Sequence, residues 1–348
     1  MIRMRGPITV LVFEHVTGGG LAGKDLPASW AAEGAAMRRA IVHDFAAVPD
    51  VRVVATLDAR LPREVGLRAN VRLVVDREGR SWESIAAEAD YTAPIAPETD
   101  GILADLARSI ERLGGRSLGS DPQAIELTAD KARLAAHFEA NGIPTPPTQL
   151  VDPSQGLPTD RDGPMIVKPV DGAGSLDTFI IRDPARPPAR LRDLRKAIVQ
   201  PYLSGVPGGA SYLVDRDGRA WLVAVGRQRI GVDPEGRVHY RGGTIGGPAG
   251  VDLTAVERAV TSVPGLRGFV GVDFLDDPRA GVTVLEINPR PTTSYVGLLR
   301  LLGPGTVAGA WLAAVEGGLE GTGWPDRLRI PDDAPPVSFD AEGGMLLD

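Results

Sequence analysis

A predicted hairpin carries two carboxylates and an amide that could bind a metal ion together. Glu286 and Asn288 are at positions i and i+2, so a β-strand presents both side chains on one face. A hairpin turn centred on residues 278–279 pairs Asp273 with Val284, which adds a second carboxylate to that face. Carboxylate and amide oxygens suit Mg²⁺, with phosphate oxygens completing its coordination. The other interpretation of the pattern is a solvated sheet face.

A lysine beside a glycine-rich loop indicates where phosphate could bind. Only four of the 38 basic residues are lysines, and Lys168 is one of them. It precedes a loop that contains Gly172, Gly174 and Ser175, whose backbone N–H groups and hydroxyl can contact phosphate oxygens. Lys131, at the start of a predicted helix, is a second cation. A plain hairpin turn is the alternative explanation of the glycines.

The segment AIVQPYL, residues 197–203, joins an apolar strand to an extended end. Such a segment can hold an adenine ring while backbone groups bond to the edge of the ring. Pro201 has no N–H, but its carbonyl can still accept a hydrogen bond from an amino group. A linker between domains is the alternative, and the two roles are compatible.

Arg290 follows Asn288 by two residues and lies on the same side if the strand continues. Its guanidinium could hold a transferring phosphoryl group there, whereas a surface arginine is the alternative. Polar residues of neighbouring strands and loops are candidates for substrate contact, against ordinary sheet or loop roles: Arg227, Gln228, Arg241, Thr292, Thr293 and Ser294.

The N-terminal stretch ITVLVFEHVTGGGLAG contains G-x-G-x-x-G, the pattern of a dinucleotide-binding turn. Its context does not fit, because four residues separate the apolar strand from Gly18, and Pro27 obstructs a helix after Gly23. A glycine loop without a ligand and a substrate-binding loop are the other interpretations. A dinucleotide-dependent oxidoreductase stays open as an alternative class.

The elements that must position these residues fall into three folded units and a tail. Residues 1–125 alternate apolar strands with helices, which predicts an α/β domain with a parallel sheet. Residues 126–198 predict a small α+β lobe, and residues 199–316 predict a second, strand-rich α+β lobe that ends in a helix. Residues 317–348 are expected to form an extended arm or tail.

Two local expectations accompany this division. Residues 91–100 are predicted as a loop at the carboxyl edge of the parallel sheet, where open α/β domains bind ligands. The helix after residue 128 is predicted to start with Thr128 as its N-cap and with Asp130 in its first turn.

The composition narrows the class of protein. The 348 residues, 24% charged and 43% hydrophobic, are typical of a globular protein of two or three domains. A net charge of −7 argues against a general nucleic-acid binder. The sequence has no apolar run of 18 residues that would span a membrane, and no cysteine for disulfides, thiolate metal sites or a nucleophile. We expect a cytoplasmic protein, and a homodimer is left open.

Taken in order, Lys131, VKPVDGAGS, VQPYL and GVDF…LEINPR resemble the ATP-grasp superfamily over residues 120–315. The resemblance implies ATP held between two α+β lobes behind an N-terminal α/β domain. The sequence departs from the family at Gln200, where many members carry glutamate, and in the loop GAGSLDT, where many place another glycine. The resemblance also implies a role for each group of site residues. Lys131 and Lys168 would contact phosphates, and Gln200, Pro201 and Leu203 would frame adenine. The residues implied to hold two Mg²⁺ ions (or Mn²⁺) are Asp273, Glu286 and Asn288, and Arg290 would face the γ-phosphate or an acyl phosphate.

The motifs VFEHVTGGG, DGAGSLDT and EINPRPTTSY are similar to one branch of that superfamily. The branch includes tyramine–glutamate ligase of methanofuran biosynthesis and its relatives in methylotrophic bacteria. This likeness implies a ligase that joins a small-molecule carboxylate to an amine through an acyl phosphate. It also implies that one N-terminal group lines the substrate side of the cleft: Glu14, His15, Gly18, Gly19 and Gly20.

The same likeness leads us to expect glutamate as the acid and a tyramine- or tyrosine-type amine as the acceptor. Glu14 is then the expected partner of the ammonium group, and Tyr91 or Tyr295 the expected wall for the aromatic ring. Arg227 and Arg241, together with Arg290, are expected to bind carboxylate. A peptide ligase for another amino acid and a non-catalytic nucleotide-binding protein are the alternatives.

Overall fold

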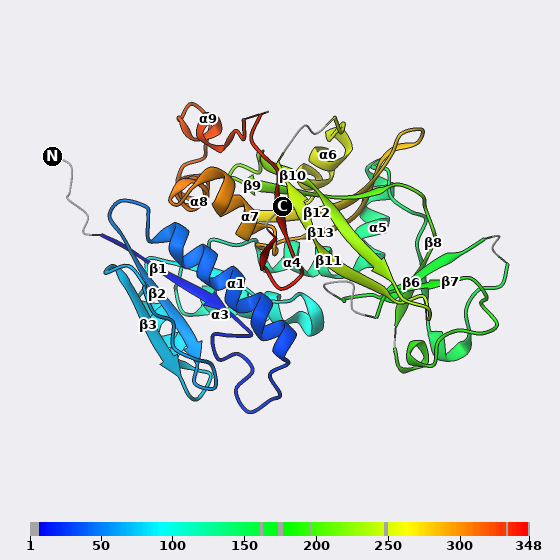
Figure 1. Ribbon diagram of the computed structural model, residues 1–348, viewed down its shortest axis with the longest axis horizontal. Helices are drawn as coiled ribbons and strands as arrows, with labels where there is room; N and C mark the ends of the chain where they lie inside the picture. Colours follow the sequence, from blue (N-terminus) through cyan, green and yellow to red (C-terminus); the bar gives the residue numbers. More distant parts are fainter. Residues whose placement is uncertain are drawn as a thin grey trace.

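A computed structural model describes residues 7–160, 163–172, 177–194, 196–246, 250–331 and 333–346. In this part of the chain the strands form three sheets (Figure 1). The N-terminal sheet lies at one end of the long axis, the largest sheet lies in the middle, and a small sheet lies at the other end. The described structure is therefore the mixed α/β plus α+β architecture that the sequence predicts.

The N-terminal sheet is parallel, with the strand order β3-β2-β1-β4. Its strands are β1 (Ile8–Glu14), β2 (Val51–Asp58), β3 (Val71–Asp76) and β4 (Tyr91–Ile95). The helices that accompany it are α1 (Ala28–Phe45), α2 (Ser81–Glu88) and α3 (Ile102–Arg112), the last preceded by the short helix η1 (Thr99–Gly101).

The prediction of a loop over residues 91–100 is wrong for its first half. Tyr91–Ile95 is strand β4, which pairs in parallel with β1 and is buried at every position. Pro94 argued against a strand in the sequence, because proline lacks the N–H that a sheet ladder needs. It is tolerated here because β4 is the edge strand of the sheet.

Two helices connect the N-terminal sheet to the small sheet, α4 (Pro122–Ala129) and α5 (Lys131–Ala140). The predicted N-cap at Thr128 is wrong, because its hydroxyl donates back to the carbonyls of Ala124 and Ile125 inside α4. Asp130 is the N-cap of α5, and its carboxylate accepts from the backbone N–H groups of residues 132 and 133. This break between two helices fixes Lys131 at the first position of α5.

The small sheet is antiparallel, with the order β5-β8-β6-β7. Its strands are β5 (Gln149–Val151), β6 (Met165–Pro169), β7 (Phe179–Ile181) and β8 (Ala197–Pro201), with the short helices η2 (Pro153–Gln155) and η3 (Ala189–Asp193) between them. The expected boundary between residues 198 and 199 falls inside β8. Because β8 pairs with β6, Gln200 and Pro201 lie opposite Ile166 and Met165.

The largest sheet is antiparallel, with the order β13-β12-β9-β10-β11-β14-β15. Its long strands are β9 (Val206–Val214), β10 (Ala220–Val232), β11 (Val238–Ile245), β12 (Gly268–Asp277) and β13 (Gly281–Asn288). The helices of this part are α6 (Thr254–Ser262), α7 (Tyr295–Leu302), α8 (Thr306–Glu316) and α9 (Trp324–Leu328).

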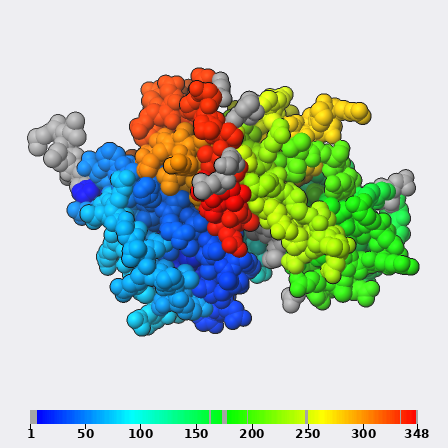
Figure 2. All heavy atoms as spheres, viewed as in Figure 1, coloured from blue at the N-terminus to red at the C-terminus, as the bar shows by residue number. Residues whose placement is uncertain are grey.

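The segment expected to be an arm or tail takes part in this sheet. β14 (Val337–Phe339) pairs with β11, and β15 (Met345–Leu346) pairs with β14. Figure 2 shows the segment, in red, lying on the surface between the N-terminal domain and the long strands. The described part of this segment is therefore an edge of the largest sheet rather than a free end.

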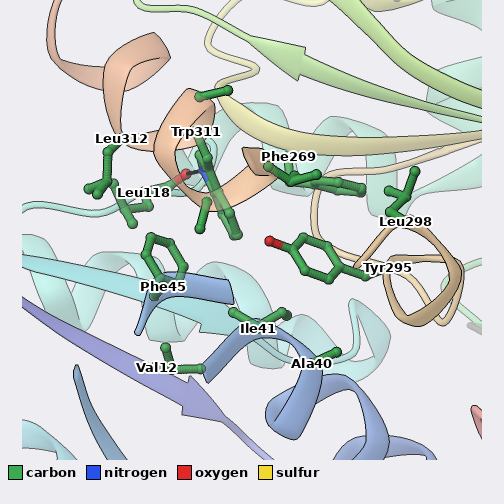
Figure 3. Packing of buried hydrophobic residues seen from close by; sticks show 14 of the residues in the cluster. Val12, Ala40, Ile41, Phe45, Leu118, Phe269, Tyr295, Leu298, Trp311 and Leu312 are labelled. Carbon is green, nitrogen blue, oxygen red and sulfur yellow. Dashed lines mark hydrogen bonds between the residues drawn. The ribbon is translucent and has the colours of Figure 1, made fainter. Parts of the chain in front are cut away.

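The N-terminal domain and the largest sheet share one hydrophobic core, which Figure 3 shows. Trp311 of α8 packs on Phe45 of α1 and on Phe269 of β12, with ring centroids 5.6 and 6.0 Å apart. The indole N–H of Trp311 donates to the carbonyl of Leu118 at 2.7 Å. Each fully buried phenylalanine contributes roughly 1.5–3 kcal/mol, so this core fixes α1 against the central sheet.

A buried carboxylate reinforces the same junction. Asp44 of α1 accepts from the hydroxyl of Tyr295 at 2.6 Å and from the N–H of Ala308 at 3.0 Å. It also accepts from the N–H of Gly305, the N-cap of α8. An acid at a helix N-terminus satisfies N–H groups that have no partner within the helix.

Among the described residues, no single helix has the length and apolarity needed to cross a membrane. The helices α7 and α8 reach that threshold only when taken together, and they are bent by 106° relative to each other.

Candidate active site

The hairpin of β12 and β13 brings the predicted acidic residues together, although its register differs from the prediction. Asp273 lies opposite Glu286 rather than Val284, which pairs with Phe274. The turn is shifted, because Asp277 pairs with Gly281, and an irregularity after Asp273 adds a further step. Each shift is one residue and would alone reverse the faces, but together they move the pairing of Asp273 by two residues. Asp273 therefore stays on the face of Glu286, and the two carboxylates become direct cross-strand neighbours.

The two carboxylates have different partners. Asp273 accepts from the side-chain amides of Gln228 at 2.7 Å and of Asn288 at 3.3 Å. Glu286 lies 3.5 Å from Nζ of Lys131 and 3.9 Å from Nζ of Lys168. Both lysine side chains are largely buried. Four segments of the chain thus meet at one charged centre, although they lie far apart in sequence.

The protonation of the two acids follows from these contacts. Burial and the neighbouring charge of Glu286 raise the pKa of Asp273. Burial also opposes ionisation of Glu286, but Lys131 and Lys168 outweigh it and lower the pKa of Glu286. The ionised form is therefore favoured at Glu286 and disfavoured at the adjacent Asp273. A cation bound beside both carboxylates would allow both to ionise.

The donor set at this centre fits Mg²⁺. It comprises two partly buried carboxylates and an amide whose oxygen can turn toward an ion, all of them hard oxygen ligands. Within the described residues, no group of three or more acidic, histidine or cysteine side chains could hold a metal by itself. Mg²⁺ commonly keeps positions for water and substrate phosphates, so a sparse protein donor set is consistent with it.

A cavity of about 370 Å³ lies on one side of this centre, between the small and the largest sheet. We call it the larger cavity. Its walls are mainly apolar, and the two lysines and Glu286 lie at its polar end. It is lined by six of the residues predicted to bind the nucleotide: Lys131, Lys168, Gly172, Gln200, Pro201 and Leu203. Gly174 and Ser175, also predicted, lie outside the described residues.

Two of these side chains are held from within the protein. The Gln200 amide donates to Oγ1 of Thr148 at 2.8 Å and is buried. Lys131 donates from Nζ to the carbonyl of Gly172, which ties α5 to the start of the glycine loop. Burial lowers the pKa of Lys168, and Glu286 opposes that shift. An anion entering the cavity would favour the charged form of this lysine.

A second cavity, of about 110 Å³, lies on the other side of the centre, and we call it the smaller cavity. The two cavities share Gln228, Asp273 and Glu286 as lining residues. The smaller cavity is also lined by the predicted residues Asn288, Arg290, Thr292, Thr293 and Ser294. The shared centre therefore stands where two compartments meet, which suits the transfer of a group from one to the other.

The floor of the smaller cavity consists largely of glycines. Gly271, Gly209, Gly226 and Gly243 come from β12, β9, β10 and β11 and line it. A Cβ atom at Gly226 would lie 2.4 Å from the carbonyl oxygen of Thr244, and one at Gly271 would lie 2.8 Å from Cγ2 of Thr292. At Gly209 the nearest atom would be Nε2 of Gln228 at 3.4 Å.

Arg290 is clamped by an acid from the N-terminal domain. Its Nη2 donates to Oε2 of Glu98 at 3.0 Å, and its Nε lies 3.0 Å from Oε1. Both side chains are largely buried, with exposed fractions of 12% and 6%. Glu98 follows β4 and immediately precedes η1. The pair holds the guanidinium at the edge of the smaller cavity in a fixed orientation.

The N-terminal glycine group does not line either cavity, contrary to the prediction. The carboxylate of Glu14 is buried and accepts from the N–H and hydroxyl of Thr17, each at 2.6 Å, and from the N–H of Val16 at 3.1 Å. It therefore stabilises the turn after β1 instead of facing a ligand. His15 is largely buried beside Gly20, and this burial lowers the pKa of His15 to about 4.

The glycines of that turn have structural reasons. Gly19 has a φ of 103°, and a Cβ atom there would lie 3.0 Å from the carboxylate of Asp76. A Cβ atom at Gly18 would lie 2.4 Å from the carbonyl oxygen of Glu14. The tight turn itself accounts for glycine at both positions.

The two other predicted arginines differ. Arg227 of β10 is among the residues that line the smaller cavity, next to Gln228. Arg241 is exposed, lies over Gly231 and lines neither cavity. The expected aromatic walls are wrong as well, because Tyr91 and Tyr295 are fully buried and bond to Glu316 and Asp44.

Besides the floor glycines, the site contains polar and aromatic side chains that were not predicted, among them Glu33, Glu98, Tyr240 and Phe339. Only Glu33 had a local signal. It stands four residues before the buried Met37, so both lie on the inward face of α1. An acidic side chain on the inward face of a helix is unusual and indicates a specific role. Glu98 and Phe339 belong to segments far from the hairpin in sequence, and no local pattern in those segments indicates that they lie at the site.

Comparisons with known proteins agree with this architecture. The family model of the ATP-grasp domain matches residues 128–294, and the model of the pre ATP-grasp 3 domain matches residues 51–125. A solved ATP-grasp superfamily protein from Archaeoglobus fulgidus is similar at a TM-score of 0.67 and 25% identity, over 88% of this chain and 89% of that chain.

Curated relatives are similar over part of their length. Tyramine–L-glutamate ligase of Methanocaldococcus fervens is 26% identical over 216 residues, which are 60% of this chain and 61% of the relative. Formate-dependent phosphoribosylglycinamide formyltransferase of Bordetella avium is 32% identical over 157 residues, which are 42% of this chain and 36% of that relative. The chain thus spans about three-fifths of the first relative and about a third of the second.

Proposed function

The chain belongs to the ATP-grasp superfamily, and we propose that it is an ATP-dependent ligase that joins a carboxylate to an amine. The observation that carries this proposal is the position of Asp273 and Glu286 between two cavities. A hydrolase would need only a nucleotide cavity and water. The smaller cavity offers a second substrate direct access to the same acidic centre.

In this proposal the larger cavity binds ATP. Its apolar walls accept the adenine ring beside the backbone of β8, and Lys131 and Lys168 bind phosphate oxygens at its polar end. Asp273, Glu286 and Asn288 would hold Mg²⁺, which supplies charge neutralisation for the phosphates when it is bound. The buried lysines favour the triphosphate end of the nucleotide near the shared centre.

The γ-phosphoryl group passes to a carboxylate oxygen of the acid in the smaller cavity, which gives an acyl phosphate and ADP. The amine nitrogen then attacks the carbonyl carbon, the bond to phosphate oxygen breaks, and the nitrogen loses a proton. Arg290, held by Glu98, stabilises the negative charge on the transferring group. The chain contributes position and electrostatics, and no side chain forms a covalent bond.

For the substrates we propose glutamate as the acid and a tyramine-type amine as the acceptor. The relative from Methanocaldococcus fervens carries these two compounds in its name. Of the residues first expected to bind them, Arg227 lines the smaller cavity, whereas Arg241 and Glu14 line neither cavity. The substrate proposal therefore rests on the likeness and on the small size of the second cavity.

The test is a reaction of the purified protein with ATP, Mg²⁺, L-glutamate and tyramine, followed by mass spectrometry and by ADP release. We expect a product with the mass of a glutamyl amide of tyramine, together with ADP and phosphate. ADP release that requires other acid–amine pairs would retain the ligase and discard these substrates. Absence of ADP release with a broad panel of acids and amines would refute the ligase.

A further inference from the structure

We infer that Glu33 binds the ammonium group of a substrate in the smaller cavity, an inference that rests on the proposed function. Glu33 comes from α1 of the N-terminal domain, yet it lines a cavity built mainly by the largest sheet. It stands across from the strands that carry the acidic centre. Its position gives the N-terminal domain a direct part in substrate choice.

The carboxylate of Glu33 has one neutral partner and no cation. Its Oε1 accepts from the hydroxyl of Thr293 at 2.6 Å. Across the described ranges, no lysine, arginine or histidine side chain forms an ion pair with it. Thr293 is itself buried, so this contact positions one oxygen and leaves the other available to a ligand. A partly buried carboxylate without a direct ion-pair partner is a favourable site for a cation.

The two arginines that line this cavity, Arg227 and Arg290, form no ion pair with Glu33. Arg290 is held by Glu98, 3.0 Å away, and its charge is favoured by Glu33 only at longer range. Tyr240 lines the same cavity, and burial together with the charges of Asp273 and Glu33 raises the pKa of its hydroxyl. The phenol therefore stays neutral and can donate a hydrogen bond, but it supplies no positive charge.

The remaining lining favours a small polar cation. Hydroxyls of Thr292, Ser294 and Ser211 lie along the cavity and bond to one another, with 2.8 Å between the first two. Such groups can accept the further hydrogen bonds of a primary ammonium. A dicarboxylate without an amino group would instead be repelled by the negative charge of Glu33. The chemical class is therefore an amine or amino acid that binds as its ammonium form.

The experiment compares two matched pairs of probes by calorimetry, with Mg²⁺ and a non-hydrolysable ATP analogue present. L-Glutamate is compared with glutarate, which lacks the ammonium group. Tyramine is compared with tyrosol, which carries a hydroxyl in its place. We expect the wild type to bind the ammonium member of at least one pair about tenfold or more tightly, as a charge-assisted hydrogen bond predicts.

Three variants separate charge from structure. Glu33→Gln keeps an oxygen that can accept from Thr293 but lacks the charge, so it should lose the preference for the ammonium probe. Thr293→Val removes the hydrogen bond and keeps the carboxylate, so it should retain the preference. Glu83→Gln removes an exposed acid of α2 outside both cavities and should behave as the wild type.

Two results would overturn the inference: a Glu33→Gln variant that still prefers the ammonium probe, or a wild type that binds none of the four probes or shows no preference. Neither depends on turnover. The proposed function is judged separately, by ADP release and amide formation. Normal turnover with an unchanged KM in Glu33→Gln would therefore remove the role of Glu33 and leave the ligase standing.

Discussion

Replacing Glu98 with glutamine should destabilise the protein far more than the loss of an ordinary surface charge. The Glu98 carboxylate is 6% exposed and forms a two-point contact with Arg290, at 3.0 Å for each nitrogen. Removing one member of a buried ion pair costs about 3–5 kcal/mol, because the remaining charge stays in a low-dielectric environment. Glu33 and Glu286 also favour the charged form of Arg290, so the arginine would keep some favourable interactions without Glu98. We therefore expect a destabilisation near the lower end of this range, at about 3 kcal/mol.

The assay is denaturant unfolding followed by tryptophan fluorescence, because Trp311 reports on the shared core. Glu98→Gln, Arg290→Met and the double variant form a cycle, and each single change should cost more than half of the double change. Asp105→Asn is the control, since Asp105 accepts from Arg108 at 2.8 Å but is 75% exposed, and its loss should cost under about 1 kcal/mol.

A destabilisation of Glu98→Gln below about 1 kcal/mol would refute the argument from burial. Additive single effects would refute it as well, because they would show that the two side chains do not stabilise each other.

Three further predictions follow from the site. Lys168→Ala should reduce ADP formation more than about tenfold, as loss of a charged contact worth 1.36 kcal/mol or more requires, while the exposed Lys196→Ala should keep wild-type activity; equal rates in the two variants would contradict the assignment. Asp273→Asn and Glu286→Gln should each raise the Mg²⁺ concentration needed for half-maximal activity, with clearly less than additive effects in the double variant; a double variant active in EDTA would exclude a shared metal. The folded state holds the pKa of His15 at about 4 against an ordinary 6.5, so the unfolded chain takes up a proton first as the pH falls. Wild-type stability should therefore drop by up to about 3 kcal/mol between pH 6.5 and 4, a loss that His15→Asn should largely remove; parallel pH–stability curves would show that His15 does not titrate in this way.

The residues around the larger cavity and the acidic centre were predictable because short local patterns indicate them. The i and i+2 spacing of Glu286 and Asn288 predicted their common face, and the error in hairpin register did not matter, since it kept the alternation of side chains. Lys168 could be located from its own strand and the glycines after it. Each of these inferences needs only a few neighbouring residues.

The residues around the smaller cavity were predicted less well because their positions depend on contacts across most of the chain. Glu33 and Thr293 are 260 positions apart, and Glu98 and Arg290 are 192 apart. Only the docking of the N-terminal domain brings these pairs together. The error at Arg241 had another cause, because its side chain is exposed and lies over Gly231, away from both cavities.

Among the glycines that form the floor of the smaller cavity, only one position allows a side chain that would change the volume of the cavity. At Gly226 and Gly271 an added side chain would collide with its neighbours, so substitutions there would disturb the sheet itself. Gly209 alone of the four has ordinary van der Waals room for a Cβ atom. A methyl group at Gly209 would lie 3.4 Å from Nε2 of Gln228 and 3.8 Å from Oδ1 of Asp273, so it would reduce the volume of the smaller cavity directly beside the acidic centre. The size of the compound that can approach that centre is therefore set by the backbone of β9, at one residue that a single substitution can change.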